Sequence, residues 1–371
     1  MAKKSLGKSD YLDIFNLFQR DGNFTSVGKL LGRGSFGEVR DIVYKNKTMA
    51  GKVVRCDTNE KFGEYFAADL RGQNLIKINK IISKRIDGIN YYLIIMEKAI
   101  LRDLGKLNDY YHNHNLLKLI FNPFNELCGD NLLRFYCKQI INAMEVLDRG
   151  NFVHFDIKPE NLLISISLII KLSDFSLLRK ISDEEKLKIP GGTNGYLSLE
   201  YYKKNEFIKG DVARKQDYFA LGATLYFLKY GKQMLKYKKL DDNDTYIITI
   251  LTQLQQEIAK IRSEKLTDQD FIDFLTKLIG YTPNDRPNFE QIIRNKWLNK
   301  DLDKLHEVFW GFEYDEEAAM RVQREEGIAI GEAKKQAEIV KNLLTTNLSL
   351  EEIARVVGWN EEKILEFAGK N

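Results

Sequence analysis

The order of strand-like and helix-like segments constrains the fold of this chain more than any other feature. Short runs rich in β-branched and aromatic residues, separated by glycine turns, fill the first quarter of the sequence at 27–31, 38–44, 49–55 and 91–96. One helix-like stretch, 60–75, interrupts these runs. After Met96 the apolar residues follow helical spacing, first over 132–149, and two short strands, 162–164 and 169–172, break the helical pattern. This order predicts an α+β fold with a small β-rich lobe, a larger helical lobe and a ligand site in the cleft between them.

Composition narrows the class of protein. Hydrophobic residues make up 44% and charged residues 30% of the 371 residues, an ordinary globular balance that excludes a largely disordered chain. The three cysteines, Cys56, Cys128 and Cys137, have no metal-binding spacing and form no disulfide framework, which favours a reducing compartment. No apolar run reaches the roughly 18 residues that a membrane span needs. We therefore expect a soluble, intracellular and cytoplasmic protein without a membrane partner.

Charge is divided unevenly along the chain. Lys and Arg number 57 and Asp and Glu 53, which gives a net charge of +4. Residues 301–371 hold 9 basic and 16 acidic side chains, a net charge of −7, so residues 1–300 carry +11. This division predicts two units that meet near residue 300. A basic body suits acidic protein substrates as well as nucleic acid, and an acidic tail repels phosphate, so no nucleic-acid partner is expected.

The segment Gly-Arg-Gly-Ser-Phe-Gly-Glu-Val at 32–39 is the first that indicates a ligand. Its three glycines allow a tight turn whose backbone N–H groups can approach phosphates closely. A dinucleotide site would require the glycines to open a helix, with an acidic residue about 20 positions later. The strand-like run 38–44 follows them instead, which favours a phosphate-covering loop between two strands. An ordinary glycine hairpin remains the alternative.

A lysine on the following strand strengthens the phosphate hypothesis. Lys52 comes one strand after the glycine loop, where its ammonium group could reach the α- and β-phosphates of a nucleotide. Such a lysine needs a carboxylate to hold it. Glu64 in the next helix-like stretch is the first candidate and Glu60 the second, and spacing alone leaves both open, with a solvent-exposed position as the alternative.

The most specific segment is Val-His-Phe-Asp-Ile-Lys-Pro-Glu-Asn-Leu-Leu at 153–163. It resembles the catalytic loop of eukaryotic-type protein kinases, normally His-Arg-Asp-x-x-x-x-Asn. The resemblance implies that Asp156 accepts or orients the proton of a substrate hydroxyl and that Asn161 holds a magnesium ion. Lys158, within Lys-Pro-Glu-Asn, is similar to the Ser/Thr-kinase form of the loop, so the implied partner is a protein substrate with a Ser or Thr hydroxyl.

Further motifs follow in the order of the same family. Asp174, in Asp-Phe-Ser, resembles the aspartate of the Asp-Phe-Gly motif and would chelate the Mg²⁺ that bridges the ATP phosphates. Thr193, in Gly-Gly-Thr-Asn-Gly-Tyr, stands in the loop that seats the substrate and would touch Asp156 and Lys158. By the same resemblance, Glu200 pairs with Arg286.

The resemblance also implies an ATP site between the lobes and covers about residues 24–300. Asp217 resembles the residue that anchors the catalytic loop. Met96 would be the gatekeeper, Asp103 would bind the ribose, and Leu163 would line the floor of the adenine pocket. The expected ATP-binding residues are Leu31, Gly32, Arg33, Gly34, Ser35, Phe36, Gly37, Glu38, Val39, Ala50, Lys52, Met96, Glu97, Ala99, Asp103 and Leu163. The implied division is an N-terminal extension 1–23, a small lobe 24–98, a large lobe 99–300 and an acidic helical tail 301–371.

Three positions depart from the family pattern. Phe155 replaces the arginine that normally receives the activation-loop phosphate, and a phenyl ring offers neither charge nor hydrogen bond for it. We therefore predict activity that does not depend on phosphorylation between Asp174 and Glu200. Ser176 replaces a glycine, which restricts backbone flips that glycine permits. The segment 107–129 is longer than usual and is expected to be a surface loop, with a partner surface as the alternative.

The leading functional hypothesis is an active Ser/Thr protein kinase that uses ATP and Mg²⁺. The alternative is a pseudokinase-like scaffold that binds nucleotide without phosphoryl transfer. Phe155, Ser176 and Ser-Leu-Glu at 198–200, where the family has Ala-Pro-Glu, favour this alternative. The acidic tail has a short helical seam over 330–344, and 327–367 is similar to tails of bacterial transposase-type nuclease families. No nuclease core precedes it. We expect the tail to dock on the kinase body or to self-associate.

Overall fold

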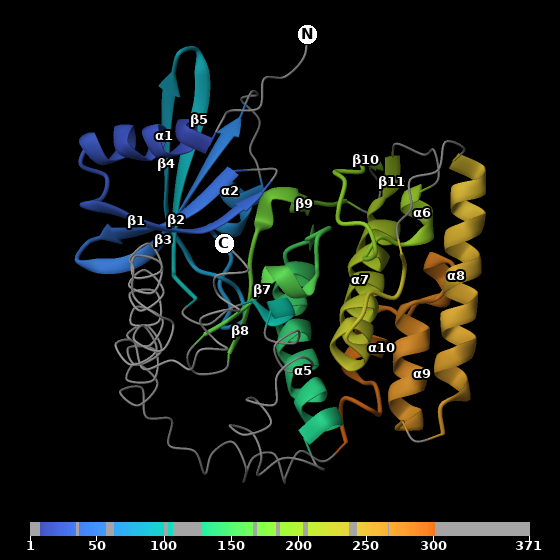
Figure 1. Cartoon of the computed structure of the whole chain (residues 1–371). Helices are drawn as coiled ribbons and strands as arrows, with labels where there is room; N and C mark the ends of the chain where they lie inside the picture. The colour runs from blue at the N-terminus through green and yellow to red at the C-terminus, as the bar shows by residue number, and fades with distance from the viewer. Residues whose placement is uncertain are drawn as a thin grey trace, which may run out of the picture. The chain divides into compact units, whose positions relative to one another are not determined.

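The computed structural model describes ten stretches of the chain: 8–34, 37–56, 63–99, 103–106, 128–165, 169–182, 186–202, 207–236, 243–265 and 267–300. Ser35, Phe36, Glu60, the tail 301–371 and most of the long segment 107–129 lie outside these residues, and so do the expectations that rest on them. Within them, a β-sheet precedes a helical region, as Figure 1 shows.

The small lobe is built on a five-stranded antiparallel sheet. Its strands, in the spatial order β1-β2-β3-β5-β4, are β1 (Ser26–Gly34), β2 (Gly37–Tyr44), β3 (Lys47–Cys56), β5 (Ile89–Met96) and β4 (Ile78–Ile86). Two-residue turns join β2 to β3 through Lys45-Asn46 and β4 to β5 through Asp87-Gly88. All four turn residues have positive φ angles, the conformation that tight hairpins require and that Asn and Gly adopt readily. The pairing of β3 with β5 joins the two hairpins and places β3 in the middle of the sheet.

Helix α1 (Lys8–Arg20) covers one face of this sheet (Figure 1). The apolar side chains Ile14, Phe15 and Phe18 are buried there, in a cluster with Phe24, Ile42, Val53, Tyr91, Leu93 and Ile95. Gly51 on β3 gives the Phe15 ring its space, because a Cβ at position 51 would lie 3.3 Å from the ring and 3.0 Å from Ile42. Helix α1 therefore packs as part of the small lobe.

The region between β3 and β5 differs from the sequence expectation. A helix was expected over 60–75, but helix α2 spans only Gly63–Ala67. The chain leaves the helix because its backbone pairs elsewhere: the N–H of Ile76 donates to Leu172 O at 2.9 Å, and the N–H of Leu172 donates to Asn74 O at 2.8 Å. Strand β4 was not predicted, because its apolar residues Ile78, Ile81, Ile82 and Ile86 do not follow the alternation of a half-buried strand.

The large lobe is mainly helical. Its elements are α5 (Cys128–Arg149), β6 (Phe152–Val153), η2 (Pro159–Asn161), β7 (Leu162–Ile164), β8 (Ile170–Leu172), η3 (Phe175–Leu177), β9 (Arg179–Lys180), β10 (Lys186–Lys188), α6 (Leu199–Tyr202), β11 (Phe207–Lys209), α7 (Gly210–Tyr230), α8 (Asn243–Ser263), α9 (Gln269–Leu278), η4 (Pro283–Asp285) and α10 (Phe289–Ile293). Three short ladders, β6 with β9, β7 with β8 and β10 with β11, hold the segments between α5 and α7.

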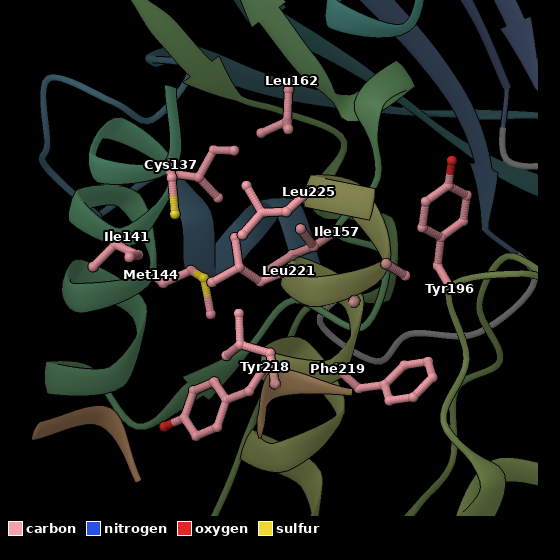
Figure 2. Packing of buried hydrophobic residues seen from close by; sticks show 14 of the residues in the cluster. Cys137, Ile141, Met144, Ile157, Leu162, Tyr196, Tyr218, Phe219, Leu221 and Leu225 are labelled. Atoms are coloured by element: carbon pink, nitrogen blue, oxygen red, sulfur yellow. The ribbon is translucent and has the colours of Figure 1, made fainter. Parts of the chain in front are cut away.

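The core of the large lobe lies between α5 and α7. Figure 2 shows Cys137 and Met144 of α5 beside Leu221 and Leu225 of α7, and all four are buried. Helix α7 ends at Gly231, which has a φ angle of +67° and donates its N–H to Phe227 O, a termination that glycine favours. This packing fixes the helices on which the loops between β6 and α7 rest.

The observed architecture confirms the expected two-lobed α+β fold, with a β-rich small lobe and a helical large lobe. Among the residues that the structure describes, no helix combines the length and the apolar character needed to cross a lipid bilayer.

Candidate active site

A polar cluster joins the two lobes at Lys52. Its Nζ atom lies 2.7 Å from Glu64 Oε1, 2.6 Å from Asp174 Oδ1 and 2.7 Å from Ser176 Oγ. Lys52 is on the central strand β3, Glu64 is on α2, and Asp174 and Ser176 lie where β8 passes into η3. We call Lys52, Glu64, Asp174 and Ser176 the Lys52 cluster. Of the two glutamates left open by the sequence, Glu64 is the one in contact with Lys52, and Glu60 lies outside the described residues.

The charges of this cluster stabilise one another. Burial alone would lower the pKa of Lys52, but the carboxylates of Glu64 and Asp174 outweigh burial and raise it above its usual value. Burial alone would raise the pKa of Asp174, but the Lys52 ammonium and the Ser176 hydroxyl outweigh burial and hold it well below its usual range. Lys52 and Asp174 are therefore both ionised near neutral pH.

A second polar cluster surrounds Asp156 in the loop after β6. Lys158 Nζ lies 2.8 Å from Asp156 Oδ2, and Thr193 Oγ1 donates to Asp156 Oδ1 at 2.6 Å. Lys158 also donates to Thr193 Oγ1 at 2.6 Å, and Asn161 Nδ2 donates to Asp156 Oδ2 at 2.9 Å. The structure thus brings together four of the expected site residues, which we call the Asp156 cluster.

Asp217 of α7 forms hydrogen bonds with the backbone of this loop. Its carboxylate accepts the N–H of His154 at 2.7 Å and that of Phe155 at 2.9 Å. Phe155 has a φ angle of +68°, an unusual conformation for a bulky residue that these two bonds support. Burial raises the pKa of Asp217 to about 7, although the two N–H donors act against that rise.

The Phe155 side chain is buried in an apolar cluster. It is 1% exposed and packs with Val153, Leu177, Ile181, Ile208 and Ala213, against partly buried Leu187, Ile189, Tyr201 and Val212. These nine residues and Phe155 form the Phe155 cluster, which draws on β6, η3, β10, β11, α6 and α7. The β10–β11 ladder pairs Leu187 with Ile208 and brings both into the cluster. Apolar packing therefore connects the segment after Asp174 to the start of α7.

Polar contacts fix the C-terminal end of the segment between Asp174 and Glu200. Glu200 and Arg286 form a bidentate ion pair, with a distance of 2.8 Å between Nη2 and Oε2. Gln216 of α7 accepts the N–H and the hydroxyl of Ser198 at 2.9 and 2.7 Å, and donates to Tyr196 O at 3.0 Å. The sequence analysis did not find the Ser198–Gln216 contact, for which the only signal was serine in place of the family's alanine.

The residues expected at the nucleotide lie around the β1–β2 hairpin and the β3, β5 and β7 strands. Ala50 is paired with Met96 across β3 and β5, and Asp103 forms a backbone bridge with Leu163. Glu97 Oε1 accepts the N–H of Lys77 at 2.7 Å. Four residues expected at the adenine and ribose thus lie in two backbone pairs, Ala50 with Met96 and Asp103 with Leu163.

The glycine loop is fastened by a buried carboxylate. Glu38 is fully buried and pairs with both Arg33 and Arg40, so the guanidinium of Arg33 donates to a side chain of the loop itself. Position 37 requires glycine, because a Cβ atom there would overlap the carbonyl oxygen of Val53. The sequence analysis expected Arg33 and Glu38 at the nucleotide and did not foresee their mutual ion pair.

The hydroxyl of Ser176 makes contacts that the sequence did not predict either. It can donate either to Asp174 Oδ1 at 2.5 Å or to Glu64 Oε1 at 3.0 Å, in addition to its contact with Lys52. The signal in the sequence was the serine in Asp-Phe-Ser, which was interpreted only as a restriction on the backbone.

Comparison with known proteins agrees with this geometry. Human MRCK alpha, a serine/threonine-protein kinase, is 29% identical over 210 residues, which cover 55% of this chain and only 12% of that protein. The Aurora kinase of Saccharomyces cerevisiae is 27% identical over 294 residues, 74% of this chain and 71% of that protein. The Aurora kinase of Debaryomyces hansenii is 28% identical over 286 residues, 73% and 61% of the two chains. The family model of the protein kinase domain matches residues 25–298. This chain therefore belongs to the protein kinase domain family.

Proposed function

We propose that this protein is an ATP-dependent Ser/Thr protein kinase that transfers the γ-phosphoryl group of ATP to protein hydroxyls. In this proposal residues 24–98 bind the nucleotide and residues 99–300 carry the catalytic loop and the substrate. The observation that carries it is the joint presence of the Lys52 and Asp156 clusters, which contain every charged group that phosphoryl transfer in this family requires. Two of the relatives are named as a serine/threonine-protein kinase and an Aurora kinase, which supports Ser or Thr hydroxyls of proteins as the substrate class.

The donor set fits a magnesium ion bound together with ATP. The Nδ2 atom of Asn161 donates to Asp156, which leaves its amide oxygen facing another direction, and both hydrogen bonds to Asp174 are made at Oδ1. The N–H of Ser173 donates to Asn161 O at 2.9 Å, so the two expected ligands come from adjoining backbone segments. One amide oxygen and one carboxylate completed by phosphate oxygens suit Mg²⁺. The ion would neutralise charge on the transferring phosphate.

The Asp156 cluster is suited to orient a substrate hydroxyl. Asp156 Oδ1 already accepts the Thr193 hydroxyl, which demonstrates that the carboxylate can receive an aliphatic O–H at 2.6 Å. Lys158 Nζ contacts Asp156 Oδ2 and Thr193 Oγ1, and it can stabilise negative charge that develops near them. In the proposed mechanism Asp156 aligns the hydroxyl of the substrate Ser or Thr with the γ-phosphorus, so that catalysis is mainly positioning.

We further propose that this activity needs no phosphate in the segment between Asp174 and Glu200. Phe155 stands where the protein kinase motif His-Arg-Asp has its arginine. Its ring is enclosed by apolar side chains. The β10–β11 ladder and the Ser198–Gln216 bonds hold the rest of the segment. These contacts support an arrangement that forms without phosphorylation.

The direct test is transfer of radiolabelled phosphate from ATP to a generic protein substrate by the parent and by Asp156→Asn. We expect the substitution to reduce transfer at least about hundredfold, because the neutral amide lacks the negative charge and the basicity with which the carboxylate accepts the hydroxyl proton. Asp273→Asn, an exposed position on α9, is the matched control and should transfer at the parent rate. Transfer that persists in Asp156→Asn would remove Asp156 from this role. A folded parent that binds ATP without transferring phosphate would favour the pseudokinase-like scaffold instead.

The acidic segment 301–371 is proposed to dock on the basic body or to self-associate, on the strength of its charge of −7 against +11 for residues 1–300. Electrostatic attraction of this kind acts over about 8 Å at physiological salt. Sedimentation of the full chain and of a chain ending at Lys300, each at low and high salt, distinguishes the two. Self-association predicts a larger species that truncation abolishes, whereas docking predicts a monomer in both cases.

A further inference from the structure

The Ser176 hydroxyl occupies the centre of the Lys52 cluster. A serine hydroxyl has one proton to donate and two lone pairs to accept with. Here it accepts from Lys52 Nζ at 2.7 Å and can donate either to Asp174 Oδ1 at 2.5 Å or to Glu64 Oε1 at 3.0 Å. The ammonium group of Lys52 has three protons, and Glu64, Asp174 and Ser176 provide one acceptor for each. Ser176 thus completes the coordination of the lysine.

A glycine on α2 makes this contact possible. A Cβ built at Gly63 would overlap the carbonyl oxygen of Phe175 and would lie 2.9 Å from the Cβ of Leu178. The first residue of α2 therefore rests directly on η3, at a distance that no side chain allows. This close approach brings Glu64, the next residue, within reach of Ser176. In this chain the glycine stands in the helix, and a side chain stands at the third position of the Asp-Phe-Ser motif.

We propose that Ser176 is a positioning residue that holds Glu64, Lys52 and Asp174 in one geometry, and that Gly63 supplies the helix contact it needs. When nucleotide and metal bind, Lys52 has to turn a proton toward the phosphates, and Asp174 has to turn an oxygen toward the metal. Ser176 can then continue to donate its hydrogen bond to Glu64, so α2 stays packed against η3 throughout the catalytic cycle. The consequence for catalysis rests on the proposed kinase function, whereas the seating of α2 does not.

Three substitutions at one position separate the hydroxyl from the backbone effect. Ser176→Ala keeps the Cβ atom that restricts the backbone but removes the hydroxyl, Ser176→Thr keeps both, and Ser176→Gly removes both. If the serine acted only on the backbone, Ser176→Ala would behave like the parent. Ser263→Ala is the matched control, because its hydroxyl donates to Lys260 O on the exposed surface of α8.

The test measures amide hydrogen exchange over residues 64–70 together with kcat and KM for ATP. In Ser176→Ala we expect exchange of this stretch to accelerate about tenfold, the scale of one hydrogen bond to charged groups. We also expect kcat/KM for ATP to fall about tenfold, mainly through KM, because the hydroxyl organises Lys52 before nucleotide arrives. Ser176→Thr should stay within about twofold of the parent in both measurements. Parent-like exchange and KM in Ser176→Ala, or equal losses in Ser176→Ala and Ser176→Thr, would overturn the proposal.

A double-mutant cycle with Gly63→Ala tests the pairing of the two positions. The added methyl group has to lift α2 from η3, so the contact between Glu64 and Ser176 is lost. We therefore expect Ser176→Ala to add less than about twofold to the exchange rate of Gly63→Ala. Additive effects would contradict a shared role. Exchange needs no phosphoryl transfer, so an inactive parent would disprove the kinase function and leave this measurement intact.

Discussion

The Lys52 cluster and the Phe155 cluster lie on neighbouring segments, and each contains a position at which the sequence departs from the protein kinase pattern. At Ser176 a polar side chain replaces a glycine and joins a group of charges. At Phe155 an aromatic ring replaces a charged side chain and joins a group of apolar residues. The two departures are chemically opposite, yet both increase the contacts that order the segment following Asp174.

The difference between the clusters concerns what each contributes. Burying and pairing charges nearly cancel in free energy, so the Lys52 cluster determines geometry more than stability. Burial of apolar surface stabilises a protein in proportion to the area removed from water, so the Phe155 cluster contributes mainly to stability. Substitutions in the first cluster should therefore reduce activity, and those in the second should reduce the free energy of unfolding.

The largest effect is expected for Asp174→Asn in the Lys52 cluster. The side chain is 37% exposed, and the substitution preserves its shape but removes the charge that faces Lys52, so the free energy of unfolding should fall by about 1 to 2 kcal/mol. Phosphoryl transfer should fall by about 10² to 10³, because the negative charge facing the metal and Lys52 is lost. Urea unfolding measures the free energy of unfolding, and transfer of radiolabelled phosphate measures the activity. A large loss of stability would contradict the proposal that the Lys52 cluster determines geometry more than stability.

In the Phe155 cluster, the substitution to compare with Asp174→Asn is Phe155→Ala. Removing a fully buried ring leaves a cavity, and we expect the free energy of unfolding to fall by about 3 to 4 kcal/mol in urea titrations. Transfer per folded molecule should fall much less than in Asp174→Asn. Phe207→Ala on β11 is the control, since that ring is 52% exposed and its loss should cost less than about 0.5 kcal/mol. Equal costs at the two positions would contradict a packing role for Phe155.

A pH dependence is expected from Asp217, which supports the loop between the clusters. Burial raises its pKa to about 7 from an ordinary 3.8, so the native state keeps this proton to a higher pH than the unfolded state does. Its contribution to stability is therefore full below the unfolded-state pKa and is lost as pH rises through about 7. We expect a fall of about 2 kcal/mol between pH 5 and 7.

Asp217→Asn isolates that slope from other groups. Burial lowers the pKa of His154, which therefore destabilises the protein as pH falls and opposes the trend. The difference between parent and variant removes the histidine contribution, and this difference should decline across the same pH range. A difference that is independent of pH would show that Asp217 is ionised throughout.

The smallest effect is expected for Tyr201→Phe, which removes a hydroxyl group and makes the Phe155 cluster more apolar. The Tyr201 ring packs against Phe155 with 6.1 Å between the ring centroids, and its buried hydroxyl finds no hydrogen-bond partner among the described residues. Removing that hydroxyl should leave stability unchanged or raise it by about 0.5 kcal/mol. Thermal unfolding of the two proteins measures this, and a clear loss would reveal a polar function for the hydroxyl.

Local pattern predicted those parts of the molecule that depend on neighbouring residues. Alternation and helical spacing placed four strands of the sheet and the long helix α5, and Lys52 was predicted to face a carboxylate of the next helix. The length of α2 was wrong, because the pairing of Asn74 and Ile76 with Leu172 ends the helix, and residues almost 100 positions apart leave no local signal. The Ser176 bridge and the Phe155 cluster were missed for the same reason: Lys52 and Ser176 are 124 positions apart.

In the proposed function, the segment between Asp174 and Glu200 takes its active arrangement without being phosphorylated. The most direct measurement compares transfer by the phosphatase-treated protein, with its unphosphorylated state verified by intact mass, with transfer by the untreated protein. We predict that kcat and KM for ATP agree within about twofold. A fall of more than about tenfold that reverses when a Ser or Thr of this segment is phosphorylated again would contradict the claim.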